Sequence, residues 1–474
     1  MNSLAGLLKG LAHRPLGRFS DRDRSKQFAP VEPSDLRAER RTLDHWKVYL
    51  SSDEFVIECS GLRLIGRDGE GEIFSGPGRI KFARHGKIEF WIYASSADHG
   101  RAFEKLRESE AAPYDALSQM RLIATDFRGQ EWHGGYCSVR VQETQSGIWF
   151  MYGEAAGLSV ETKAPWCRQS PSVELIFLDP LGWPLSEWSE TIHRFEDEVV
   201  EYSRQSARQI LHVLGSEIHF EKDRELNALW VVASTSDALC HPYLERWLSE
   251  PLRVLSGALV YPTAFARNFG DGRSSVTFMP TPKIERPSKL GLYPPNWSID
   301  QKSETLWALY GQLLCTIARG NDLEPHAITR LYEELAQANQ GSRWVLILTL
   351  ASAIESLAKA GVTPADIVSE YPAEVLHSME AYLRSWSGDK NLRSRMLSSL
   401  ALSKKRSVQS YLRELAKAGK ITPLGVDAWM NLRNSVMHGE LVEPWATAQG
   451  DAQLGSLVDL FHDLTRLLID QNED

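Results

Sequence analysis

Cysteine is scarce in this chain of 474 residues. Its five cysteines are widely spaced, odd in number and form no C-x-x-C pair: Cys59, Cys137, Cys167, Cys240 and Cys315. A disulfide-stabilised secreted fold and a cysteine-ligated zinc site both need denser and more regular cysteines. The spacing therefore argues against both classes and suits a protein of the reducing cytosol.

Long hydrophobic runs and the common metal and nucleotide motifs are missing as well. The longest apolar run, from Trp344 to Ile354, is too short to cross a bilayer, and Lys9 interrupts the N-terminal apolar stretch where a secretory signal would continue. The thirteen histidines show no H-x-x-x-H or H-E-x-x-H spacing, and no lysine follows a glycine-rich phosphate loop. We therefore expect a cytoplasmic protein without a membrane span, a metal site or a cofactor.

The overall composition is that of a globular protein with a moderate negative charge. Hydrophobic residues make up 43% and charged residues 24% of the chain, and the net charge is −9. Such a charge argues against a protein that coats nucleic acid with its whole surface, but it leaves room for a local basic groove. The length predicts two or three domains.

The first 300 residues are predicted to be rich in strands. Residues 1–42 are charged in their second half and are expected to form a flexible lead-in. Residues 43–180 contain short runs of β-branched and aromatic residues separated by Gly, Asp and Pro, which predict a β-rich sandwich or barrel. Residues 181–298 are expected to form a mixed α/β domain, and the proline-rich segment 289–300 marks its end.

Residues 301–474 are predicted to form an all-helical bundle, so the fold class expected for the whole chain is α+β and multidomain. Helical periodicity with Gly or Pro punctuation marks eight segments: 304–319, 324–338, 343–360, 373–386, 391–402, 406–418, 424–438 and 453–470. The third segment is apolar nearly all round, which is typical of a helix at the centre of a bundle. Glu355 lies on its apolar face and therefore needs a cation or several donors. It is either part of a structural ion pair or cap, or it holds a functional Arg or His of another helix.

The segment "NLRNSVMHGE", residues 431–440, combines groups suited to acid–base chemistry. On a helix, Asn434 and His438 are four residues apart and meet on one face, so the amide can orient the imidazole. The long stem of Arg433 can bring its guanidinium to the same place. In RNA cleavage, the His can move a proton and the Arg can stabilise charge on the phosphoryl oxygens. The alternative is that Arg433 and His438 merely suit the last turn of a helix that ends at Gly439.

"RNSVMHG" and the helix "TLASAIESLAKAG" together resemble the HEPN domains, a family of helical bundles that includes many prokaryotic ribonucleases. A β-rich region of about 300 residues before such a bundle resembles the ApeA-like HEPN proteins of bacterial antiviral defence. The resemblance implies that Arg433 and His438 are catalytic, with Asn434 and Glu355 in support. It also implies a dimer that pairs two such motifs and leaves a 2′,3′-cyclic phosphate. This chain differs from the family by roughly 60 residues inserted between the two helices.

The inserted stretch carries the strongest signal for nucleic-acid binding. Between residues 384 and 420 the chain has ten lysines and arginines and only two acidic residues. Such a patch attracts phosphates without reading bases, and we expect Lys404, Lys405, Arg406 and Arg413 to bind RNA. The alternative is an ordinary solvated helical face.

These observations predict a metal-independent endoribonuclease, a toxin-like effector of anti-phage defence that acts as a homodimer or higher homo-oligomer. Its N-terminal region would either sense a phage-derived trigger or regulatory partner, or hold the nuclease in check. One alternative is a non-catalytic HEPN-like binding or dimerisation module with a sensing β-rich region. Another is a β-domain that binds carbohydrate or peptide, although no aromatic platform evident in the sequence requires it.

Overall fold

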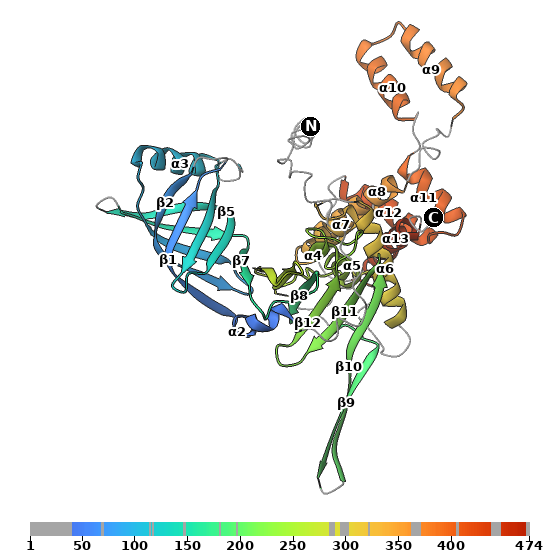
Figure 1. Cartoon of the computed structure of the whole chain (residues 1–474). Helices are drawn as coiled ribbons and strands as arrows, with labels where there is room; N and C mark the ends of the chain where they lie inside the picture. Colours follow the sequence, from blue (N-terminus) through green and yellow to red (C-terminus); the bar gives the residue numbers. More distant parts are fainter. Residues whose placement is uncertain are drawn as a thin grey trace.

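The computed structural model describes most of the chain from residue 40 onward. The described residues are 40–67, 71–112, 115, 118–145, 148–179, 182–195, 198–283, 290–293, 303–320, 323–361, 371–403, 407–437 and 447–470. A barrel lies at one end of the molecule, helices lie at the other, and an open part of the sheet joins them (Figure 1). The predicted order, a β-rich N-terminal region followed by a helical C-terminal region, is confirmed.

Six strands close into a barrel in the order β4-β1-β2-β3-β6-β5, with β5 pairing again with β4. Buried and more exposed side chains alternate along β3 because successive side chains of a strand point to opposite faces. The strands are β1 (Glu54–Ile65), β2 (Glu72–Ala83), β3 (Ile88–Ala94), β4 (Met120–Asp126), β5 (Glu131–Gln145) and β6 (Ile148–Ala155). Of the two expected architectures, sandwich and barrel, the chain forms the barrel.

A helix that the sequence pattern did not indicate lies against this barrel. Helix α3 (His99–Ala111) begins at Asp98, whose carboxylate accepts a hydrogen bond from the backbone N–H of Arg101 at 3.1 Å. An aspartate in this position satisfies one of the free N–H groups of the first turn. The helix packs on β5 and β2 through Ala102 and Leu106.

The sheet continues from the barrel into an open antiparallel part. Strand β7 pairs with β5 of the barrel and with β14 of the open part. From there the order is β14-β13-β8-β12-β11-β10-β9. These strands are β7 (Leu158–Lys163), β8 (Ser172–Leu178), β9 (Glu187–Phe195), β10 (Glu198–Val213), β11 (Ser216–Asp223), β12 (Ala228–Ser234), β13 (Ala264–Asn268) and β14 (Arg273–Phe278).

Strand β8 is buried along its whole length because two hydrophobic cores meet there. Val173, Leu175 and Phe177 belong to a core that continues into the helices. Ile176 and Leu178, which point to the other face, belong to the core on the barrel side. This is why the segment reads as an almost unbroken apolar run instead of alternating.

The region from residue 303 onward is helical in its described residues, and its eight helices from α6 onward each coincide within a few residues with one predicted segment. Helix α8 packs against α7, α11, α12 and α13, as its apolar circumference indicates. The described helices are α4 (Leu244–Trp247), α5 (Glu250–Ser256), α6 (Ser303–Arg319), α7 (Ala327–Ala338), α8 (Arg343–Ala360), α9 (Ala373–Ser385), α10 (Lys390–Ser403), α11 (Val408–Lys417), α12 (Pro423–Met437) and α13 (Ala448–Asp470). Among them we find no helix that is both long and apolar enough to cross a bilayer.

Helix α6 joins the helical region to the open part of the sheet. The indole of Trp307 packs on Phe220 of β11 at a ring-centroid distance of 4.5 Å and donates to the Pro184 carbonyl at 2.8 Å. The Tyr310 hydroxyl donates to the Leu248 carbonyl at 2.8 Å. Sheet and helices therefore share one continuous core.

Candidate functional site

Two of the predicted site residues, Glu355 and Arg433, lie against each other on neighbouring helices. Nε and Nη2 of Arg433, on α12, both donate to Oε2 of Glu355, on α8, at 3.3 Å. The side chains are 35% and 28% exposed, respectively. Glu355 therefore holds an arginine that comes from 78 residues further along the chain and remains open to solvent.

Trp429, one turn before Arg433, fixes α12 against α8. Its buried indole donates from Nε1 to the carbonyl of Ala351 at 3.1 Å. The ring also lies under the guanidinium, with Arg433 Cζ 5.5 Å from the ring centroid. Trp429 contacts Ala351, and four residues later on both helices Arg433 contacts Glu355. The two helices therefore run in the same direction here. Both members of the ion pair thus stand on regular helical backbone.

Two cations keep the Glu355 carboxyl group ionised. Lys359 donates from Nζ to Oε1 at 2.8 Å, while Arg433 binds Oε2. The hydrogen bond from Lys359, helped by the charges of Lys359 and Arg433, lowers the pKa of Glu355 below its ordinary value despite partial burial. The carboxylate is therefore charged at neutral pH and can orient the guanidinium of Arg433.

The other two predicted catalytic residues are described only in part. Asn434 follows Arg433 on α12, and its side chain is exposed. His438 and Gly439 lie outside the described residues. The contact between Asn434 and His438, and the cap at Gly439, stay predictions. The described part of the candidate site therefore consists of the oriented Arg433 and the exposed amide of Asn434.

Of the predicted RNA-binding residues, only Arg413 can be placed. It lies exposed on α11, and its Nη2 is 3.6 Å from Sδ of Met430, which is one turn before Arg433 on α12. Arg413 thus extends toward the helix that carries the candidate site. Lys404, Lys405 and Arg406 lie outside the described ranges, so their part in RNA binding stays a prediction.

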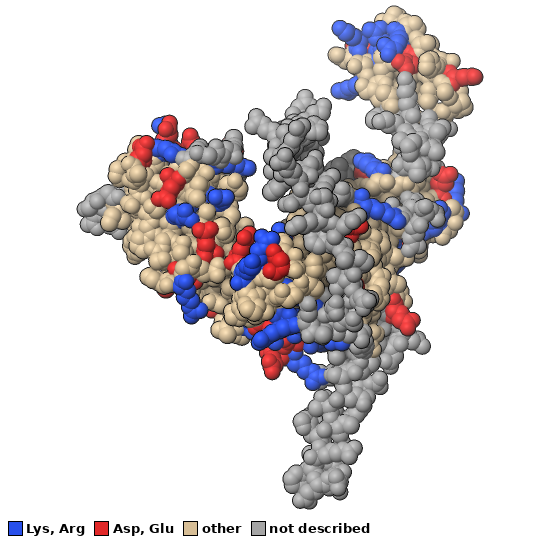
Figure 2. All heavy atoms as spheres, viewed as in Figure 1, with Lys and Arg blue, Asp and Glu red and all other residues tan. Residues whose placement is uncertain are grey.

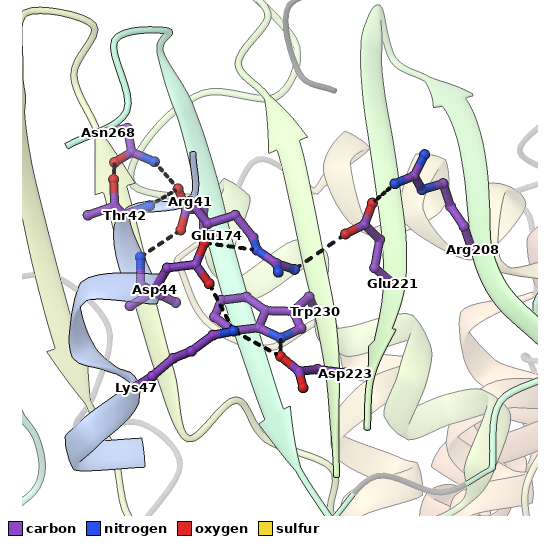
Figure 3. Close-up of polar contacts among 11 residues, drawn as sticks. Arg41, Thr42, Asp44, Lys47, Glu174, Arg208, Glu221, Asp223, Trp230 and Asn268 are labelled. Atoms are coloured by element: carbon purple, nitrogen blue, oxygen red, sulfur yellow. Dashed lines mark hydrogen bonds and ion pairs between the residues drawn. The ribbon is translucent and has the colours of Figure 1, made fainter. Parts of the chain in front are cut away.

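A second polar cluster, which the sequence pattern did not reveal, lies in the open part of the sheet (Figure 3). Glu174 of β8 is fully buried and accepts hydrogen bonds from the backbone N–H groups of Thr42 at 2.8 Å and Leu43 at 2.9 Å. Asn268 donates to the same carboxyl group at 3.1 Å and accepts from the Thr42 hydroxyl at 2.6 Å. Burial raises the pKa of Glu174, although these donors oppose the shift.

This cluster anchors a short helical segment, η2 (Thr42–Trp46) and α2 (Lys47–Leu50), to the sheet. The guanidinium of Arg41 lies 4.2 Å from the Trp230 ring centroid and pairs with Glu221 at 3.3 Å. Lys47 pairs at 3.3 Å with Asp223, which also accepts from the Trp230 indole at 3.2 Å (Figure 3). Because Glu174, Glu221 and Asp223 each bind the segment or Arg41 beside it, we interpret the cluster as structural. The feature of the sequence that could have indicated this cluster is Glu174, the single carboxylate within the apolar run of β8.

A cleft of about 650 Å³ between β10 and α6 shares no lining residue with the ion pair of α8 and α12. Its polar lining comes from His212, Gln312, Cys315, Thr316 and Arg319. Within the described ranges, no three His, Cys, Asp or Glu side chains come together as a possible metal site. All five cysteines are free thiols.

No family model, curated protein or solved structure matches this chain.

Proposed function

We propose that this chain is a metal-independent endoribonuclease whose catalytic residues are Arg433 and His438, with Asn434 and Glu355 in support. The observation that carries the proposal is the attachment of Arg433 to Glu355 by two donor atoms at 3.3 Å. The arginine so held belongs to the same R-N-x-x-x-H segment as the predicted acid–base histidine. A held but solvent-accessible guanidinium is suited to bind a phosphate.

The roles of the residues follow from RNA chemistry. His438 takes the proton of the 2′-hydroxyl or protonates the leaving 5′-oxygen, and Asn434 sets the orientation of its imidazole. Arg433 stabilises the negative charge that builds up on the phosphoryl oxygens. Glu355 acts as a positioning residue, because its carboxylate contacts Arg433 and not the substrate. The products are a 2′,3′-cyclic phosphate and a free 5′-hydroxyl.

The biological setting is also part of the proposal. Resemblance to ApeA-like HEPN proteins suggests a toxin-like effector of anti-phage defence whose β-rich region senses a phage-derived trigger or regulatory partner. Five free thiols, three of them buried, favour the reducing cytoplasm as its location. The core shared by β11 and α6 gives a physical route by which the β-rich region could restrain the helices.

A homodimer completes the proposal, and the hairpin of α9 and α10 offers the surface for it. This hairpin projects away from the other helices (Figure 1). Leu376 and Leu383 are buried within it. On its outside, apolar side chains stay exposed at helical spacing: Val375, Met379 and Tyr382 on α9, and Leu392 and Met396 on α10. An exposed apolar stripe of this kind favours a helical partner.

Charge makes a second copy of the hairpin the fitting partner. Helix α9 carries Glu374 and Glu380, the second of which already pairs with Arg384 of the same helix at 2.7 Å, whereas α10 carries Lys390, Arg393 and Arg395 and no acidic residue. Figure 2 shows basic side chains gathered on one part of the hairpin surface. In a two-fold arrangement, α9 of one copy can lie against α10 of the other, so that opposite charges meet twice.

One observation favours the alternative, a non-catalytic helical module. The contacts of Arg433 with Glu355 and Trp429 also tie α12 to α8, as a purely structural ion pair does. In that case Arg433 and His438 only stabilise the last turn of the helix, and the chain acts through binding or dimerisation.

Cleavage of RNA by Arg433→Ala distinguishes the two functions. The matched control is Arg330→Ala, which removes another ion pair of 3.3 Å in the helical region, between Arg330 and Glu324. The proposal predicts that Arg433→Ala lowers cleavage by about 10²-fold or more while Arg330→Ala does not. Cleavage retained by Arg433→Ala would rule out this catalytic site, and a parent chain that cuts no RNA would favour the non-catalytic module.

A further inference from the structure

The outer face of the barrel carries a row of four side chains in register across four strands. Arg79 of β2 lies opposite Trp91 of β3, Trp91 lies opposite Tyr152 of β6, and Tyr152 lies opposite Arg140 of β5. The two rings are in contact at a centroid distance of 5.7 Å, and Cζ of Arg79 is 5.0 Å from the Trp91 ring centroid. Two aromatic rings are therefore bracketed by two arginines.

A second pair of rings lies beside the first, two residues further along the same strands. Tyr93 of β3 lies opposite Phe150 of β6, and their rings are stacked at 4.9 Å with an interplanar angle of 25°. Tyr93 is 57% exposed. Successive outward residues of a strand are about 7 Å apart. We call the four rings of Trp91, Tyr93, Phe150 and Tyr152 the aromatic platform.

Polar contacts at one edge hold this platform in place. The Tyr152 hydroxyl donates to Glu89 at 3.0 Å and to Glu154 at 2.9 Å. Lys87 donates to Glu154 at 2.7 Å and so offsets part of the negative charge. The inward neighbours Phe90, Ile92 and Met151 are fully buried in the barrel. The rings therefore stand on an ordered sheet, with the carboxylates at one end and arginines on both flanks.

We propose that the aromatic platform binds a single-stranded polynucleotide, with bases stacked on the rings and phosphates bound by Arg79 and Arg140. Base stacking on aromatic side chains, combined with basic residues along the backbone, is a general way to bind single strands without sequence preference. The proposal deepens the proposed function and rests on it for the identification of the strand as RNA.

A purely structural role for the rings, or a neutral ligand, accounts for less of the arrangement. Cross-strand aromatic pairs stabilise a sheet on their own, but they do not require arginines in register on both outer strands. A neutral carbohydrate would stack on the rings as well, yet it has no charge for Arg79 and Arg140 to bind. The combination of rings and cations selects an anionic ligand with flat faces.

The test is a binding titration of the full-length chain carrying Arg433→Ala, which is expected to cut the probe more slowly by about 10²-fold or more. The probe is a fluorescein-labelled ten-nucleotide oligouridylate, followed by fluorescence anisotropy at several salt concentrations. An oligothymidylate of the same length tells whether the strand has to be RNA, and an RNA duplex tests the need for unstacked bases. Trp91→Ala with Tyr93→Ala is compared with Phe103→Ala, an exposed aromatic residue of α3.

Replacing the rings should change mainly the affinity, whereas replacing the arginines should change mainly its salt dependence. Loss of Trp91 and Tyr93 is expected to weaken single-strand binding about tenfold or more, with little change in salt dependence. Loss of Arg79 and Arg140 together should reduce the slope of log K against log salt by about 1.4, because each phosphate contact contributes about 0.7 for single strands. Arg128→Ala, an exposed arginine in the turn after β4, is the control for charge.

The proposal is overturned if the chain binds no single strand, if it binds duplex RNA equally well, or if the platform variants bind as their controls do. Preferred binding of a neutral oligosaccharide would also overturn it. The arginine variant preserves every ring, so it tests the proposal even if the aromatic variant fails to fold. Because the assay measures binding by a cleavage-deficient chain, failure of the platform and failure of the ribonuclease proposal are separate results.

Discussion

The guanidinium of Arg433 on α12 donates twice to one carboxylate oxygen of Glu355 on α8, at 3.3 Å from each nitrogen. Since both side chains are about one-third exposed, this ion pair is worth only about 0–1 kcal/mol to stability. Its main consequence is therefore orientation: the arginine is held in one place and still faces solvent. An arginine kept this way is suited to the phosphate-binding role that we propose for Arg433.

Glu355→Gln tests that orientation. The amide loses the charge that directs Arg433, so we expect cleavage to fall about tenfold or more, because small misplacements of a catalytic group are costly. The free energy of unfolding should change by no more than about 1 kcal/mol. Glu324→Gln, which weakens the 3.3 Å pair with Arg330, is the matched control. A drop in melting temperature without loss of cleavage would assign Glu355 to structure alone.

The basic stretch between α10 and α11 should bind RNA through charge. Replacing Lys404, Lys405 and Arg406 together by Ala is expected to weaken RNA binding and to flatten its salt dependence, with little change in sequence preference. The measurement is the slope of log K against log salt for the triple variant and the parent. An unchanged slope would place the RNA elsewhere on the protein.

The exposed stripe of α9 should hold two copies together. Met379→Glu with Tyr382→Glu places like charges in the proposed interface, so sedimentation analysis should show a monomer where the parent forms a dimer. Phe103→Glu alters an equally exposed aromatic residue on α3 and should leave the dimer intact. If the α9 variant sediments as the parent does, the copies associate through another surface or not at all.

Glu174 should make stability depend on pH. Burial raises its pKa above the ordinary value of 4.5, so folding favours the protonated form. The stability linked to Glu174 is full below about pH 4.5 and declines as the pH rises through the folded-state pKa. Glu174→Gln cannot titrate, so thermal unfolding of this variant should lose less stability over that rise than the parent does. A parallel pH profile for both proteins would contradict the shift.

Local periodicity was sufficient to predict the helices from α6 onward and the β-rich start, but not helix α3. The apolar circumference of residues 343–360 placed α8 among other helices, and the Gly and Pro residues between segments marked the helix ends within a few residues. Glu355 was recognisable because a carboxylate on an apolar helical face needs a partner. That its partner is Arg433 depends on packing between helices, which no local pattern gives.

Contacts between side chains on different strands could not be predicted from the sequence, because they too depend on how the elements pack. The rings of Trp91 and Tyr152 are 61 residues apart in the sequence and become neighbours only through the register of β3 with β6. The attachment of Thr42 to Glu174 spans 132 residues. Both features leave a weak local trace: alternating aromatics in β3 and β6, and one carboxylate in the apolar strand β8.

Cleavage by His438→Ala in the presence of EDTA tests the central claim most directly. A general acid or base commonly contributes about 10²–10⁴ in rate, whereas a histidine at a helix end adds only about 1 kcal/mol to stability. We predict that the parent chain cuts RNA in EDTA to leave a 2′,3′-cyclic phosphate, and that His438→Ala loses this activity while its melting temperature hardly changes. Full cleavage by His438→Ala, or activity that EDTA abolishes and a divalent ion restores, would contradict this mechanism.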